Sequence, residues 1–142
     1  MAQFKDIGNG LHLGSQPTEQ DLQEAKESGV KTVIDFRLPM ETAIPNKKLV
    51  AESGLHYVNI PVNKANPSEE QIAELDKVLQ RDDGPFLLHC GTGMRAAMLL
   101  ALSMAKKNHW GAERTFEEAK SLGYDLKASP EFSAFVTRTV GT

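Results

Sequence analysis

The sequence holds a single cysteine, Cys90, among its 142 residues. A single cysteine excludes an internal disulfide, a CxxC redox pair and a zinc site built from several cysteines. Long hydrophobic runs are also missing, because the apolar run that begins at Ala96 soon meets Ser103 and Lys106 and is too short to cross a bilayer. Neither sign of charge is in large excess, since the sequence has 16 Lys and Arg, 19 Asp and Glu and a formal net charge of −3. That balance gives no electrostatic reason to expect nucleic acid or a membrane surface as a partner.

Length and composition favour a single domain that spans residues 1–142. The chain is 40% hydrophobic and 25% charged, which is typical of a soluble globular domain and not of a disordered chain. It shows no internal repeat, low-complexity tract or linker-like stretch. Because Met1 to Asp6 hold no apolar segment of the kind that a signal peptide needs, the expected location is the cytoplasm. No metal site or cofactor is expected, since His12, His56 and His109 lack metal-ligand spacing.

Capping residues and apolar spacing predict helices that alternate with strands. Ser68 and Gln71 have the spacing of a capping box, and Thr18 with Asp21 repeats it before an earlier helix. The predicted strands cover residues 11–13, 30–34, 56–60 and 86–89. The predicted helices cover residues 18–28, 45–53, 68–81, 96–107, 115–122 and 130–140. This alternation predicts an α/β fold with three layers, in which helices cover both faces of a mostly parallel central sheet.

Polar residues follow three of the predicted strands. Asp35 and Arg37 follow the strand at 30–34, Asn63 follows the next strand, and Cys90 follows the strand at 86–89. Parallel strands place their carboxyl ends at one edge of a sheet, and open α/β sheets bind ligands there. We therefore expect these four side chains to meet at one site.

The segment from Cys90 to Arg95 has the composition of an anion-binding loop between a strand and a helix. Gly91 and Gly93 permit backbone angles with which several N–H groups point at one place, and the helix N-terminus adds further donors. Such donors stabilise a thiolate, which is the reactive form of cysteine, while Arg95 can hold two oxygens of a tetrahedral anion. These features predict covalent catalysis on a phosphoryl or sulfur oxyanion. The predicted anion-binding residues of the loop are Gly91, Thr92, Gly93, Met94 and Arg95.

A structural interpretation stays open beside the catalytic one. A cysteine after an apolar strand is often a small core residue, and glycines at a strand-to-helix turn can serve tight packing alone. The coincidence of a strand, two glycines, an arginine, a helix and no other cysteine favours catalysis. His89 is as consistent with a packed, hydrogen-bonded histidine as with a group that tunes Cys90.

Several ordered segments together carry a resemblance to a known family. They are Gly14 to Pro17, Val33 to Arg37 with Glu41 after it, Tyr57 to Val62, and His89-Cys90 with Arg95. From about Leu11 to Lys107 the chain resembles the cysteine phosphatases of the dual-specificity and tyrosine-phosphatase superfamily, and it is most similar to the bacterial beta-lactamase-hydrolase-like, phosphatase-like domains. The resemblance implies a dual-specificity-phosphatase-like fold and hydrolysis of a phosphate monoester through a phosphocysteine. It also implies that Cys90 is the nucleophile and Arg95 the anion clamp.

Three departures from the phosphatase pattern leave the reaction type open. Four residues separate Cys90 from Arg95 where phosphatases have five, and this shorter loop resembles that of rhodanese-type sulfurtransferases. Asn63 and Lys64 stand where phosphatases supply an aspartate general acid, and Ala96 replaces the Ser or Thr that often follows the arginine. None of these departures weakens sulfur transfer, since sulfite leaves thiosulfate without needing a proton.

Three hypotheses on function therefore remain: a phosphatase, a thiosulfate-type sulfurtransferase with a Cys90 persulfide, and a catalytically silent oxyanion-binding module. The expected partner in each is a small oxyanion or a phosphorylated substrate. Asp35 is the candidate for a general acid in place of the missing aspartate, although it is equally consistent with a residue that caps the neighbouring loop or forms an ion pair. Arg37 and Asn63 are further candidates for anion binding.

Overall fold

A computed structural model describes residues 4–8, 10–38, 50, 52–63, 65–82 and 84–141. Its centre is a five-stranded sheet with the strand order β1-β2-β5-β3-β4. The strands are β1 (Phe4–Asp6), β2 (Leu11–Gly14), β3 (Thr32–Asp35), β4 (His56–Asn59) and β5 (Phe86–His89). Strands β2, β5, β3 and β4 run parallel, and β1 pairs with β2 in the antiparallel direction. The prediction of a mostly parallel sheet in an α/β domain is therefore confirmed.

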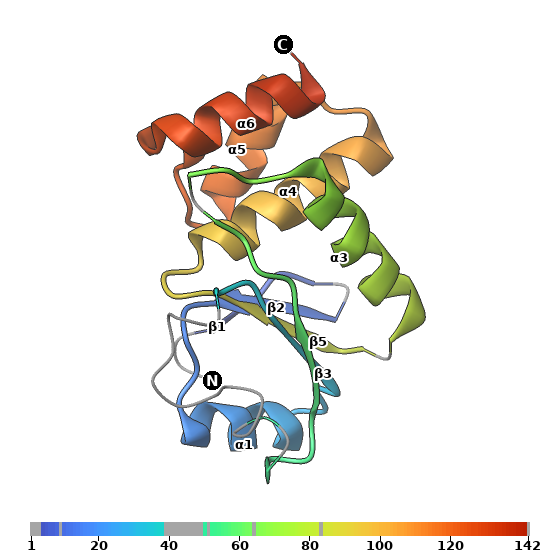
Figure 1. The fold of residues 1–142 in the computed structure, drawn as a ribbon. Coiled ribbons are helices and arrows are strands. Elements are labelled where there is room, and N and C mark those ends of the chain that lie inside the picture. The colour runs from blue at the N-terminus through green and yellow to red at the C-terminus, as the bar shows by residue number, and fades with distance from the viewer. Residues whose placement is uncertain are drawn as a thin grey trace.

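Helices lie on both faces of this sheet (Figure 1). One face is covered by α1 (Glu19–Glu27), and the other by α3 (Glu69–Arg81) and α4 (Met94–Asn108). Beyond α4 lie α5 (Ala112–Ser121), the 3-10 helix η2 (Leu126–Ala128) and α6 (Pro130–Val140). Helix α4 contacts α3, α5 and α6 as well as β2 and β5, so it is the central helix of that side. Within the described ranges, no helix has the length and apolar character needed to span a membrane.

Two hydrophobic clusters separate the layers. Val33 and Leu87 share one cluster with residues of α1, and Ile34 and Leu88 share the other with residues of α4. Successive residues of a strand point to opposite faces, which accounts for this division. All four side chains are fully buried. Each such burial removes apolar surface from water and stabilises the fold by about 1.5–3 kcal/mol.

Local capping explains where three of the helices begin. The Thr18 hydroxyl accepts a hydrogen bond from the Asp21 amide, and the Asp21 carboxylate accepts one from the Thr18 amide. Ser68 caps α3 with Gln71 as its reciprocal partner, and Ser129 caps α6 directly before Pro130. These caps satisfy amides that a helix N-terminus leaves without intrahelical partners. The predicted capping boxes are confirmed.

Other predicted elements differ from the structure. Helix α4 begins at Met94 rather than Ala96, because the helix starts directly after the positive-φ residue Gly93. Strand β1 and helix η2 were not predicted. The predicted helix at 45–53 falls mostly outside the described residues. Gly54, the residue after this segment, has a φ of +79°.

Candidate active site

Cys90 lies at the carboxyl edge of the sheet, on the first residue after β5. The residues from 90 to 93 connect β5 to α4, and the Phe36 amide donates a hydrogen bond to the His89 carbonyl (2.9 Å). This bond continues the β3–β5 pairing past the strand end, so the loop starts from a fixed point. Cys90 itself is fully buried. The structure thus places the candidate nucleophile at the edge that the sequence predicted, with its sulfur in a dry environment.

The loop turns back on the Cys90 sulfur through Gly93. The Gly93 amide donates a hydrogen bond to Cys90 Sγ at 3.0 Å. Gly93 has a φ of +94°, a backbone conformation that is unfavourable for any residue with a side chain. A Cβ at this position would also come within 2.8 Å of two ring carbons of Tyr124. Glycine is required here for both reasons.

Arg95 bends over the same loop from the first turn of α4. Its side chain is buried, and its Nη1 donates to the Val62 carbonyl at 3.1 Å. Its Nη2 lies 3.5 Å from the position that a Cβ on Gly91 would take. The guanidinium is therefore held between the Val62 carbonyl and the Gly91 end of the loop. A buried guanidinium at the Gly91 end of the loop that begins with Cys90 is suited to binding an anion at this loop.

The remaining loop residues lie on the open side. Gly91 and Thr92 are exposed and Met94 is half-buried. The Thr92 hydroxyl accepts a long hydrogen bond (3.4 Å) from the Met94 amide, so its oxygen helps to shape the turn into α4. Their role in anion binding stays a prediction.

Asp35 belongs to a network of buried polar groups. Its two carboxylate oxygens accept hydrogen bonds from the Arg37 amide (2.9 Å), Arg37 Nε (3.1 Å), Arg37 Nη2 (3.2 Å) and the Tyr57 hydroxyl (2.8 Å). Burial opposes the charged form, but the hydrogen bonds from Arg37, the nearby His89 and the Tyr57 hydroxyl outweigh it and hold the pKa of Asp35 below its usual 3.8. The carboxylate is therefore ionised at neutral pH and acts as an acceptor in this arrangement.

The other members of the network stay neutral. Burial lowers the pKa of His89 from 6.5 to about 4, against the pull of the Asp35 charge. His89 Nδ1 lies 3.9 Å from Asp35 Oδ1, and at neutral pH this contact is not an ion pair because the imidazole carries no charge. Burial and the hydrogen bond to Asp35 raise the pKa of Tyr57. Among the described residues, the network thus holds one negative and one positive charge, on Asp35 and Arg37.

This network lies on the face of the sheet away from Cys90. Asp35 pairs with His89 in the β3–β5 register, and strand alternation puts both side chains on the same face as Val33 and Leu87, toward α1. Cys90 belongs to the cluster on the α4 face. The structure therefore brings Cys90 and Arg95 together, and it does not bring Asp35 or Arg37 to the Cys90 sulfur. Their catalytic and anion-binding roles stay predictions.

Asn63 lies directly after the carbonyl that holds Arg95. It is exposed, and its Oδ1 accepts a hydrogen bond from the Ala65 amide at 2.9 Å. The side-chain oxygen therefore shapes its own turn, and a role of Asn63 in anion binding stays a prediction. Two further bonds hold the strand before it, because Asn59 Nδ2 donates to the Asp35 carbonyl (2.7 Å) and the Arg37 carbonyl (3.0 Å).

Tyr124 is a site residue that the sequence analysis missed. It stands between α5 and η2, half-buried, with its ring packed on the main core and its hydroxyl against Gly93. Burial raises the pKa of Tyr124, and the charge of Cys90 raises it further. No spacing in the sequence connects residue 124 to the loop at 90–95. The folding of α5 back along α4 brings them together.

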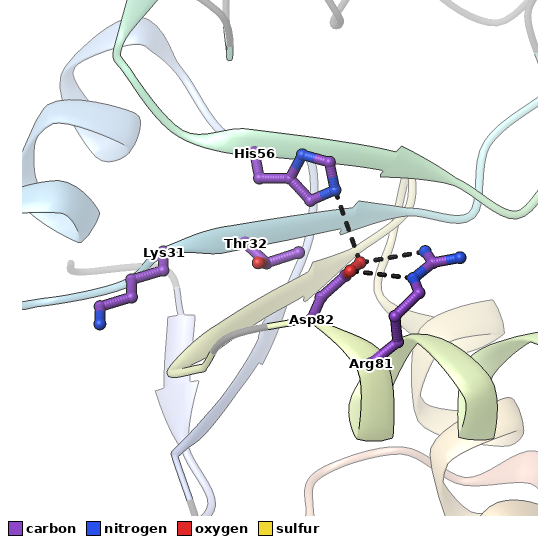
Figure 2. A pocket seen from close by; sticks show the side chains of 5 residues that line it. All are labelled: Lys31, Thr32, His56, Arg81 and Asp82. Carbon is purple, nitrogen blue, oxygen red and sulfur yellow. Dashed lines mark hydrogen bonds and ion pairs between the residues drawn. The ribbon is translucent and has the colours of Figure 1, made fainter.

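A hollow of about 220 Å³ lies at the opposite edge of the sheet (Figure 2). It is lined by Lys31, Thr32, His56, Arg81 and Asp82. Arg81 and His56 both turn toward the Asp82 carboxylate, with Arg81 Nε at 3.0 Å and His56 Nε2 at 3.5 Å. Since Thr32 and His56 begin their strands, this hollow is at the amino edge and does not contain Cys90.

The strand, loop and helix around Cys90, on a sheet of this topology, define the class of the dual-specificity and tyrosine phosphatases. The chain belongs to the family described as DSP-PTPase phosphatase fused to NAD+ kinase, whose profile matches residues 4–129. It is thus a phosphatase-like protein of the cysteine-dependent type, as the resemblance in its sequence implied.

A curated relative and two solved structures are similar to this chain. A beta-lactamase hydrolase-like protein of Xylella fastidiosa is 26% identical over 128 residues, which are 85% of this chain and 29% of the relative. The chain therefore spans less than a third of the length of that relative. The structure of a DUF442 protein of Shewanella putrefaciens CN-32 matches with a TM-score of 0.77 and 25% identity, over 96% of this chain and 87% of that one. Pseudomonas aeruginosa TpbA in complex with pTyr shares the fold, with a TM-score of 0.77 and 19% identity over 94% and 82% of the two chains.

Proposed function

We propose that this chain hydrolyses a phosphate monoester through a phosphocysteine on Cys90, with Arg95 as the anion clamp. The observation that carries the proposal is the arrangement of the loop: the Gly93 amide donates to Cys90 Sγ at 3.0 Å, and the buried Arg95 lies over the same loop. The chemical class of the substrate, a small phosphorylated molecule or side chain, follows from the tetrahedral anion that such a loop accepts.

The proposed reaction has two steps. The Cys90 thiolate attacks phosphorus, an S–P bond forms, and the P–O bond to the leaving group breaks with its electron pair going to that oxygen. Water then attacks the phosphocysteine, the S–P bond breaks, and the thiolate is restored as phosphate leaves. Arg95 contacts the phosphoryl oxygens in both steps and balances their charge.

Asp35 and Arg37 are proposed as positioning residues rather than groups that touch the substrate. The network ties the carboxyl end of β3 to β4 through Asp35, Arg37, Tyr57 and Asn59. We also propose that residues 1–142 act as one catalytic domain, because the site combines elements from both halves of the chain.

Turnover of p-nitrophenyl phosphate tests the proposal, with Cys90→Ser and Ser103→Ala as a matched pair. Ser103 is on α4 and hydrogen-bonds to Asp76, away from the loop. Turnover by the wild type, loss of turnover in Cys90→Ser and retention in Ser103→Ala are expected. A transient mass gain of one phosphoryl group on rapidly quenched wild type, absent from Cys90→Ser, identifies the intermediate.

A parallel sample treated with thiosulfate distinguishes phosphoryl from sulfur transfer. The matching family is described as a phosphatase family, and TpbA was solved in complex with pTyr, a phosphate monoester, which favours phosphoryl transfer. The four-residue spacing between Cys90 and Arg95 is the observation that favours sulfur transfer. A gain of one sulfur atom on Cys90, with no turnover of aryl phosphate, would replace the proposed reaction by sulfur transfer.

A further inference from the structure

The proposed reaction needs a proton donor for the leaving oxygen, and the segment after β4 does not provide a carboxylate. Between Pro61 and Ser68 the sequence holds no Asp or Glu. Asp35 is ionised, and its side chain lies on the other face of the sheet. A leaving alkoxide that departs without a proton is a poor leaving group, so another donor is needed for esters of ordinary alcohols.

Tyr124 brings a phenol hydroxyl to the loop. A Cβ built on Gly93 would contact the Tyr124 hydroxyl, and it would come within 2.8 Å of the ring carbons Cε1 and Cζ. The amide of the same Gly93 donates to Cys90 Sγ at 3.0 Å. The hydroxyl is therefore separated from the nucleophile by one loop residue. Since Tyr124 is half-buried, its ring is fixed by packing while the side chain keeps access to solvent.

The Tyr124 hydroxyl is available as a donor. It makes no hydrogen bond to any group in the described part of the chain. The other tyrosine, Tyr57, differs in this respect because its hydroxyl donates to Asp35 at 2.8 Å. Burial and the charge of Cys90 keep the Tyr124 phenol protonated at neutral pH by raising its pKa above the usual 10.0. A protonated phenol can donate to an oxygen on which negative charge develops.

We propose that Tyr124 is a catalytic residue that donates the proton of its hydroxyl to the leaving-group oxygen of a phosphate monoester bound at Cys90. This inference rests on the proposed function. As the Cys90 thiolate forms the S–P bond and the P–O bond breaks, the electron pair on the leaving oxygen takes the Tyr124 proton, so an alcohol and a phenolate result. In the second step the phenolate takes a proton from the attacking water, and the released phosphate and the Cys90 thiolate complete the cycle.

The dependence of the rate on the leaving group tests this role. We compare Tyr124→Phe with the wild type on p-nitrophenyl phosphate, phenyl phosphate and an alkyl phosphate. Because p-nitrophenolate departs without a proton, Tyr124→Phe is expected to change kcat/KM for that ester by less than about threefold, and to lower it for the alkyl ester by about 100-fold. An equal loss for all three esters, or no loss for any, overturns the inference.

Two controls distinguish a proton donor from a residue that only shapes the site. Tyr124→Phe keeps the ring on Gly93, so its melting temperature and its inhibition by inorganic phosphate are expected to match the wild type. Tyr57→Phe removes the only other tyrosine hydroxyl. It is expected to change kcat/KM by the same factor for every ester, because Tyr57 acts through the network and not on the leaving oxygen.

The outcomes also separate this inference from the proposed function. If the wild type turns over none of the three esters, the proposed function is wrong and Tyr124 has no leaving group to protonate. If Cys90-dependent turnover is present but Tyr124→Phe leaves the rates of the three esters in the wild-type ratio, the function stands and the role of Tyr124 alone is wrong.

Discussion

Replacing Asp35 by asparagine removes the only negative charge beside a buried guanidinium in the described network. The Asp35 and Arg37 side chains are 2% and 1% exposed, so neither charge is solvated by water. An asparagine has one acceptor oxygen in place of two and turns an NH₂ group toward other donors. Removing one partner of a buried ion pair leaves an uncompensated charge and costs about 3–5 kcal/mol. We expect Asp35→Asn to lower the free energy of unfolding by an amount in this range at pH 7.

The difference in unfolding free energy between the wild type and Asp35→Asn is expected to become smaller at acidic pH. The folded-state pKa of Asp35 lies below the usual 3.8, so the network stabilises the fold above the unfolded-state pKa. That contribution is lost as the pH falls through the lower, folded-state pKa. Urea unfolding of the two proteins at pH 7 and again at about pH 3 should therefore show a smaller difference in the acidic sample.

Glu74→Gln serves as the matched control, because Glu74 is exposed on α3 and has no ion pair within the described residues. It should change the free energy of unfolding by no more than about 0.5 kcal/mol at either pH. A loss below about 1 kcal/mol for Asp35→Asn at pH 7 would refute the assignment of a buried, mutually dependent ion pair.

Three further changes test other parts of the molecule. Gly93→Ala should lower the free energy of unfolding by about 1–2 kcal/mol because of the positive φ, and by a further amount because the new Cβ clashes with Tyr124. Urea unfolding in a Tyr124→Ala background should show the loss from the positive φ but not the loss from the clash. An unchanged stability of Gly93→Ala would contradict the geometry. Arg95→Ala, made in Cys90→Ser to prevent turnover, should weaken the affinity for inorganic phosphate about tenfold or more by NMR titration, and equal affinities would remove Arg95 as the clamp. Ser68→Ala should lower stability by about 1 kcal/mol by loss of the α3 cap, which a thermal melt can check against Ser121→Ala at an exposed helix end.

Elements with a local signal were predictable from the sequence. Thr18 and Ser68 predict the starts of α1 and α3, because a capping box depends only on residues that are three positions apart. The carboxyl-edge position of Cys90 also followed, since the order of strands and helices determines which loops meet at one edge. The close pairing of Cys90 with Arg95 followed from their position on one loop.

Features that depend on distant parts of the chain were not predictable in this way. Strand β1 has only three residues, and its pairing with β2 across Gly10 stabilises it more than its own composition does. Tyr124 reaches Gly93 only because α5 packs along α4. The face on which Asp35 lies could have been inferred from strand alternation, which puts residues 33 and 35 on one side and 34 and 36 on the other.

The bond from Arg95 to the Val62 carbonyl has a consequence for mutational tolerance. A carbonyl oxygen belongs to the main chain and is present whatever side chain the residue carries. The direction of the guanidinium therefore depends on the path of the backbone after β4, which the Asn63 side chain shapes through its bond to the Ala65 amide. Substitutions at Ala65, which is exposed, keep that amide and can alter what approaches the loop while the clamp stays in place. A library that varies position 65 should yield altered substrate preference at little loss of stability.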